Sequence, residues 1–187
     1  MEAFLVSTLV VAIAEIGDKT QLLAIVLAAR FRRPLAITLG ILVATIANHA
    51  LAGLFGQFLG HLMTPGVMRW VVGLSFLSMA AWALIPDKPD DADRPLDRFG
   101  PFVATLVAFF LVEIGDKTQI ATVALAARFP SVVAVVIGTT LGMMAANVPA
   151  VLFGDFAAGR LPMKAIRAAA AAIFAGLGVF TLLGFAV

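Results

Sequence analysis

One seven-residue segment occurs twice in this chain without change, and both copies lie inside long apolar stretches. The first copy, EIGDKTQ, covers residues 15–21 and the second covers residues 113–119. Each copy therefore places two acids and a lysine among apolar neighbours. An ionised side chain at the centre of a bilayer costs about 2.5–3.5 kcal/mol on insertion scales, so such residues usually line a polar path or a binding site. The repeated segment is the first candidate for a functional site.

The composition is that of an integral membrane protein. The chain is 62% hydrophobic and 13% charged, against roughly 45–50% and about 25% in a soluble domain. Its 187 residues suffice for about six membrane helices of roughly 20 residues each. The absence of cysteine excludes disulfides and thiolate ligands. The N-terminus has no positive n-region, which indicates a retained first span and not a removed signal peptide.

Six apolar segments can be marked along the chain, and an acidic stretch at 87–98 separates three of them from the other three. The segments cover residues 3–29, 35–62, 66–85, 102–127, 132–158 and 163–187. The first exceeds the roughly 20 residues needed to cross a bilayer, so we expect it to tilt or break near the repeated segment. The predicted fold is an all-α integral membrane protein of six transmembrane helices.

The two halves are repeats of each other. The offset between the copies is 113 − 15 = 98, and the same offset aligns Gly40 with Gly138 and Arg69 with Arg167. Three helices per half is an odd number, so the second half must enter the membrane in the opposite sense. We therefore predict two inverted three-helix repeats, at 1–86 and 99–187, joined by an acidic cytoplasmic linker at 87–98. Transporters often use this plan, with the site near the midplane.

Basic residues in the joints predict the orientation. One side of the predicted membrane receives only Arg69 and Arg128. The other receives the rest, which are Arg30, Arg32, Arg33, Lys88, Arg94, Arg98, Arg160, Lys164 and Arg167. The positive-inside rule then places both termini on the external side.

The chemistry of the two copies favours a divalent cation. On a helix, acids three residues apart share a face, so the copies could pool the four carboxylates of Glu15, Asp18, Glu113 and Asp116. With Lys19 and Lys117 as counter-charges the formal charge is −4 + 2 = −2, which one divalent cation or two protons neutralise. Gly17 and Gly115 permit close helix contact or a local helix break.

The ligand set indicates which cations fit. Carboxylates supported by amide and hydroxyl oxygens suit calcium, manganese and magnesium better than copper(I) or zinc. The possible supporting ligands are Gln21, Gln119, Thr20, Thr118, His49 and Asn147. Such an ion would be transported substrate, and no bound cofactor is expected.

Less specific interpretations of the same residues stay open. His49 could be a hydrogen-bonded packing residue, and the lysines could be counter-charges or ligands. The acids and lysines could also form internal salt bridges that only fix helix packing. Buried pairs are poor stabilisers, and two acids would remain unpaired, so we favour a cation site.

The motif resembles the E-x-G-D-[KR]-[ST] signature of the Golgi calcium/manganese–proton exchangers, their plastid manganese-transporting relatives and bacterial manganese exporters. Both signatures are intact, and the resemblance covers essentially the whole chain. It implies six spans, a cytoplasmic acidic loop, proton-coupled divalent-cation transport, and a cation site made by the acids of both signatures. In its compact length the chain is similar to bacterial members of this family, which lie in the inner (plasma) membrane. This resemblance implies manganese efflux.

Other classes of protein fit less well. The paired Gly-Asp motifs resemble those of intramembrane aspartyl proteases. Those enzymes use a Tyr-Asp and a Gly-x-Gly-Asp motif, and this chain has no tyrosine. An exporter of amino acids or other small solutes is a second alternative. The carboxylate of such a substrate prefers cationic groups in its binding site, whereas this motif supplies four acids. A passive channel is a further alternative. The predicted partners are a divalent metal ion, protons and membrane lipid, without nucleic acid and without enzymatic activity; the sequence leaves oligomeric state open.

Overall fold

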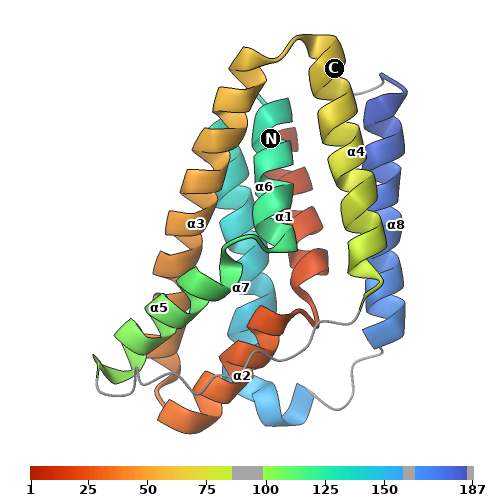
Figure 1. Cartoon of the computed structure of the whole chain (residues 1–187). Helices are drawn as coiled ribbons and strands as arrows, with labels where there is room; N and C mark the ends of the chain where they lie inside the picture. The colour runs from red at the N-terminus through yellow and green to blue at the C-terminus, as the bar shows by residue number, and fades with distance from the viewer. Residues whose placement is uncertain (86–98, 158–162, 185–187) are drawn as a thin grey trace.

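A computed structural model describes residues 1–85, 99–157 and 163–184, and these contain helices and no strand. The predicted linker 87–98 and Arg160 lie outside the described residues. The helices, shown in Figure 1, are α1 (Glu2–Glu15), α2 (Lys19–Phe31), α3 (Pro34–Leu62), α4 (Pro65–Ala83), α5 (Gly100–Glu113), α6 (Lys117–Arg128), α7 (Val132–Ala157) and α8 (Met163–Leu182). The prediction of an all-α chain is confirmed for the described residues.

Four of these helices are long and apolar enough to cross a membrane. The candidate spans are Pro34–Leu62, Pro65–Ala83, Val132–Phe153 and Lys164–Leu182. The helices α1, α2, α5 and α6 have 14, 13, 14 and 12 residues, fewer than the roughly 20 that a crossing needs. The count of six crossings therefore stays a prediction, which depends on how these four short helices combine.

The first long apolar segment is broken at the repeated segment, which decides between the tilt and the break that its length left open. Helix α1 ends at Glu15 and α2 begins at Lys19, because Gly17 has a φ of 77°. Glycine adopts positive φ without the steric cost that a side chain imposes. The second copy breaks in the same way between α5 and α6, where Gly115 has a φ of 78°.

The helices of one half pack on helices of the other half. Helix α1 packs along α7, and α3 packs along α5 and α6. Glycines permit these contacts: a Cβ at Gly40 would lie 2.8 Å from the carbonyl oxygen of Phe102, and a Cβ at Gly138 would lie 2.6 Å from that of Phe4. The two contacts correspond at the offset of 98 residues. They bring the two breaks into the middle of the bundle.

Helices α4 and α8 form a separate layer. They pack along each other, and the rings of Phe76 and Phe174 stack at 6.3 Å between centroids. The pair also rests on α6 and α1, but among the described residues it makes at most slight contact with α2 and α5. Figure 1 shows the pair at one side of the bundle, with α5 at the opposite side and α2 at the lower end.

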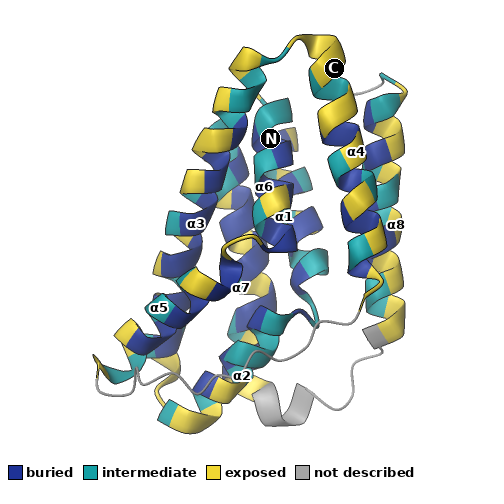
Figure 2. Ribbon diagram, in the orientation of Figure 1, coloured by how far each residue is buried: buried dark blue, intermediate teal, exposed yellow. Residues whose placement is uncertain are grey.

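Burial follows the pattern of a membrane protein, with polar groups inside and apolar groups outside. The side chains of Asn48 and His49 in the middle of α3 are buried, whereas Leu54, Phe55 and Phe58 on the same helix are exposed. Figure 2 shows exposed residues along the outer faces of α3, α4 and α8. The interior polar residues need partners inside the protein, and the buried acids Glu15, Asp18, Glu113 and Asp116 all lie at the breaks.

Candidate cation site

Each break places an aspartate at the start of a helix and a glutamate at the end of another. Asp18 is the N-cap of α2 and Asp116 the N-cap of α6, and neither uses its side chain to cap the helix. The backbone N–H of Asp18 donates to the carbonyl oxygen of Glu15 at 3.0 Å, and Asp116 donates likewise to Glu113 at 3.1 Å. These turns hold both acids of a copy together. Helix N-termini carry partial positive charge, so the turns place an acidic side chain at the positive end of α2 and of α6.

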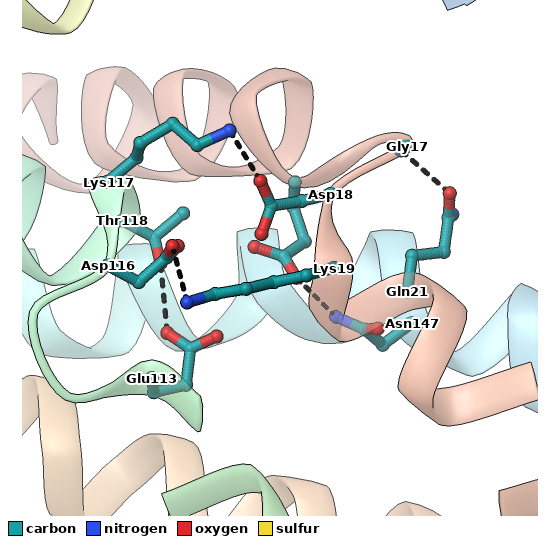
Figure 3. Close-up of polar contacts among 10 residues, drawn as sticks. Gly17, Asp18, Lys19, Gln21, Glu113, Asp116, Lys117, Thr118 and Asn147 are labelled. Carbon is teal, nitrogen blue, oxygen red and sulfur yellow. Dashed lines mark hydrogen bonds and ion pairs between the residues drawn. The ribbon is translucent and has the colours of Figure 1, made fainter. Parts of the chain in front are cut away.

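The lysines connect the two breaks. Lys117 Nζ lies 2.6 Å from Asp18 Oδ1, and Lys19 Nζ lies 3.2 Å from Asp116 Oδ1. Each lysine thus pairs with the aspartate of the other repeat, as Figure 3 shows. The side chain of Lys117 is 5% exposed and that of Lys19 is 22% exposed. The role of the two lysines as counter-charges stays a prediction, and these ion pairs across the two repeats support it.

The glutamates are completely buried, and each keeps one oxygen without a hydrogen-bond partner. Asn147 Nδ2 donates to Glu15 Oε1 at 3.1 Å, and Thr118 Oγ1 donates to Glu113 Oε2 at 2.9 Å. The remaining oxygens, Glu15 Oε2 and Glu113 Oε1, are buried without a hydrogen bond. An unsatisfied buried oxygen is costly, so these two atoms are the best positions for an added cation or proton.

The glutamines of the repeated segment support the breaks. The backbone N–H of Gly17 donates to Gln21 Oε1, and that of Gly115 donates to Gln119 Oε1, both at 2.7 Å. Gln21 Nε2 also donates to the carbonyl oxygen of Ala146 at 3.1 Å. We expected these glutamines as possible ligands. In this arrangement their side-chain oxygens accept hydrogen bonds from the glycine N–H groups, which make no hydrogen bond within a helix.

The other predicted supporting residues differ in their contacts. Thr20 and His49 are buried, and neither the threonine oxygen nor either ring nitrogen has a hydrogen-bond partner. His49 therefore does not hydrogen-bond to Glu113, although its counterpart Asn147 bonds to Glu15.

Two sets of contacts lie outside the ligand roles that the sequence suggested. Asn48 is buried beside His49 in the sequence, donates to the carbonyl oxygen of Phe110 at 3.1 Å and keeps its own Oδ1 unpaired. The bonds between each glutamine and the glycine four residues before it were also missed. The spacing of four residues between glycine and glutamine is the signal that could have indicated them.

The carboxylates do not by themselves form a closed metal cage. Within the part of the chain that the structure describes, no group of three or more His, Cys, Asp or Glu is placed so as to hold a metal ion. The lysine ammonium groups lie against the aspartates instead. The arrangement is chemically a cluster of four buried acids bridged by two tethered cations, and the free glutamate oxygens make it able to accept further positive charge.

The chain was compared with known proteins. The family model described as "Divalent cation/proton antiporter GDT1" matches residues 3–91 and 101–186. The chain belongs to this family of divalent cation/proton antiporters. Both matched segments contain one copy of the repeated motif, so the family match covers both halves of the site.

Individual relatives agree with the family. The chain is 49% identical, over 93% of its length and 87% of the relative's, to a protein of Vibrio cholerae serotype O1 named "Putative manganese exporter". It is 29% identical, over 89% of each chain, to GDT1-like protein sll0615 of Synechocystis. No solved structure matches the chain.

Proposed function

We propose that this protein exports manganese from the cell in exchange for protons, with calcium as a possible second substrate. The observation that carries the proposal is the pair of completely buried glutamates, Glu15 and Glu113, each with an oxygen that lacks a hydrogen bond. They lie at helix breaks whose aspartates are joined by lysines across the two repeats. The family membership supports cation and proton as the exchanged species, and the name of the Vibrio relative supports manganese.

Charge balance explains the exchange. Four carboxylates and two ammonium groups sum to −4 + 2 = −2, and a buried site of that charge is strongly disfavoured. One divalent cation neutralises it, and two protons do the same. The site is therefore stable when it holds either substrate, and each substrate releases the other. In this mechanism the glutamate oxygens provide the first ligands, and the aspartates join them as the lysines move away.

The broken helices complete the membrane topology in this proposal. We place α1 with α2 in one crossing and α5 with α6 in another, so that the chain crosses the inner membrane six times as two inverted repeats. Both termini then lie outside the cell. Half-helices that meet at the midplane are a common way to build a transporter site.

The α4–α8 pair provides the element that moves. It packs on α1 and α6 but hardly on α2 and α5, and a small cavity beside Asp18 and Lys117 is lined by residues of α8. Transport would follow when the pair leaves α1 and α6 and packs on α2 and α5, which opens the site to the other side of the membrane.

Flux measurements in proteoliposomes test the proposal. With an imposed pH gradient, the wild type should move manganese and dissipate the gradient, while magnesium and calcium are tested in parallel. Glu15→Gln removes a charge at a buried oxygen and should abolish flux. Glu2→Gln makes the same chemical change at an exposed position and should leave it intact. Wild-type flux in Glu15→Gln, or amino-acid efflux without metal movement, would contradict the proposal.

A further inference from the structure

The two basic residues at the predicted external end line the same cavity. Arg69 lies in the first turns of α4, and Arg128 is the last residue of α6. The cavity has a volume of about 240 Å³ and is also lined by Met63, Met68 and Thr181. The positive-inside rule disfavours arginine on this side of a membrane. Both arginines on this side line one cavity, which indicates that their positive charges bind a ligand there.

Polar atoms at this cavity lack partners. Arg69 Nε and Thr181 Oγ1 are buried without a hydrogen bond, and an unsatisfied buried donor is costly. The guanidinium of Arg128 lies 4.6 Å from the centre of the Phe129 ring and interacts electrostatically with Glu2. Two arginines and one carboxylate leave a net charge of 2 − 1 = +1. The cavity therefore suits an anion that accepts several hydrogen bonds.

An apolar groove continues from this cavity along α4 and α6. A second cavity of about 50 Å³ shares Met63, Met68, Val72 and Ala127 with the first and extends to Ser75 and Ile120. The hydroxyl of Ser75 is bonded to the carbonyl oxygen of Val71 at 2.8 Å, so it adds no free donor to the groove. The groove runs from the end of the helices toward their middle, which is the direction of an acyl chain in a bilayer.

We propose that the cavity and the groove form a binding site for an anionic phospholipid of the external leaflet. The phosphate accepts hydrogen bonds from Arg69, Arg128 and Thr181, and one acyl chain lies in the groove along α4 and α6. Charged hydrogen bonds from arginine to phosphate are among the strong polar contacts in proteins. The bound lipid would connect α4, which belongs to the moving pair, with α6, which belongs to the fixed bundle.

Native mass spectrometry of the detergent-purified protein tests this site, with phosphatidylglycerol as the probe. The wild type should retain one phosphatidylglycerol, and the double variant Arg69→Gln/Arg128→Gln should bind it at least about tenfold more weakly, because two charged donors are lost. Val71→Phe places a ring in the groove from an exposed position on α4 and should also weaken binding. Arg30→Gln is the matched control, since Arg30 is exposed and corresponds to Arg128 at the offset of 98 residues.

Competition separates a lipid from a simple anion. Inorganic phosphate has the charge without the chain, and diacylglycerol has the chains without the charge, so neither should displace phosphatidylglycerol. Retention equal to the wild type in the double variant would overturn the proposal. Displacement by inorganic phosphate, together with normal binding in Val71→Phe, would overturn it as well. If the double variant does not fold, the phosphate competition and the Val71→Phe variant still test whether the site binds a phospholipid.

Discussion

The break between α1 and α2 and the break between α5 and α6 follow the same backbone path, but their side chains meet different neighbours. Ile16 has φ and ψ of −63° and 116°, and Ile114 has −62° and 118°. Lys117, however, is almost completely buried and lies 6.0 Å from the centre of the Trp82 ring, whereas Lys19 is partly exposed. The same seven-residue segment thus gives the same backbone conformation in both halves. The environment of its charges is determined by residues elsewhere in the chain.

The glutamates show the same difference. Glu15 receives a hydrogen bond from Asn147 on α7, and Glu113 receives one from Thr118 within its own copy. Thr20, the counterpart of Thr118, has no such bond, and neither does His49, the counterpart of Asn147. The two halves of the site are chemically alike but energetically unequal, so a substitution in one half should not equal its counterpart in the other.

The lysines should show the largest inequality. Lys117→Ala removes the ammonium group that lies 2.6 Å from the buried Asp18, and removing one partner of a buried pair costs about 3–5 kcal/mol. Lys19→Ala should cost less, because water reaches part of that side chain and screens the charge that remains. Thermal unfolding in detergent measures both variants. Equal losses of stability would show that the difference in burial has no energetic consequence.

The asparagine on α7 should matter more than the histidine on α3. Asn147→Ala removes a hydrogen bond to an ionisable oxygen of Glu15, which is worth about 1.5–3 kcal/mol, or roughly tenfold or more in the apparent affinity for manganese. His49→Ala removes no hydrogen bond, because neither ring nitrogen makes one. Manganese titration of both variants tests the expectation. A larger effect for His49→Ala would instead make the histidine a ligand of the bound ion.

The glycines of the two breaks should behave alike. Gly115→Ala and Gly17→Ala each place a side chain at positive φ, which costs roughly 1–2 kcal/mol. At Gly115 a Cβ would meet no other atom within 4 Å, so the cost comes from the backbone alone. Gly176→Ala is the control: a Cβ there is equally free of contacts, but the residue lies inside α8, where alanine is the better helix former. Stability that falls in Gly176→Ala and not in Gly115→Ala would contradict this account.

The sequence was sufficient for the class of protein, but it left open whether the first and fourth apolar segments are broken at the repeated segment. Apolar composition predicted membrane helices, and a first segment longer than one crossing predicted a tilt or break near Gly17. Both arguments use only local properties of the chain. The two copies of the repeated segment lie close enough for each lysine to pair with the aspartate of the other copy. The common metal cage that we expected them to form stays a prediction.

The cross-pairing of lysines and aspartates could not be predicted in the same way. Lys19 is adjacent to Asp18, and nothing in the segment indicates that its ammonium reaches Asp116 of the other repeat. The pairing depends on how the two breaks lie against each other, which is set by contacts such as Gly40 on Phe102 and Gly138 on Phe4. These contacts join residues far apart in the chain, and no local pattern encodes them.

The glycine contacts between α3 and α5 and between α7 and α1 have a consequence for the origin of the molecule. Each half presents a close-packed helix surface that the other half covers, so we expect neither half to be stable when expressed alone. A gene that encoded a single half would have needed two copies of its product to cover both surfaces. In such a homodimer every pair of corresponding positions would be identical, whereas the single chain can carry His49 in one half and Asn147 in the other.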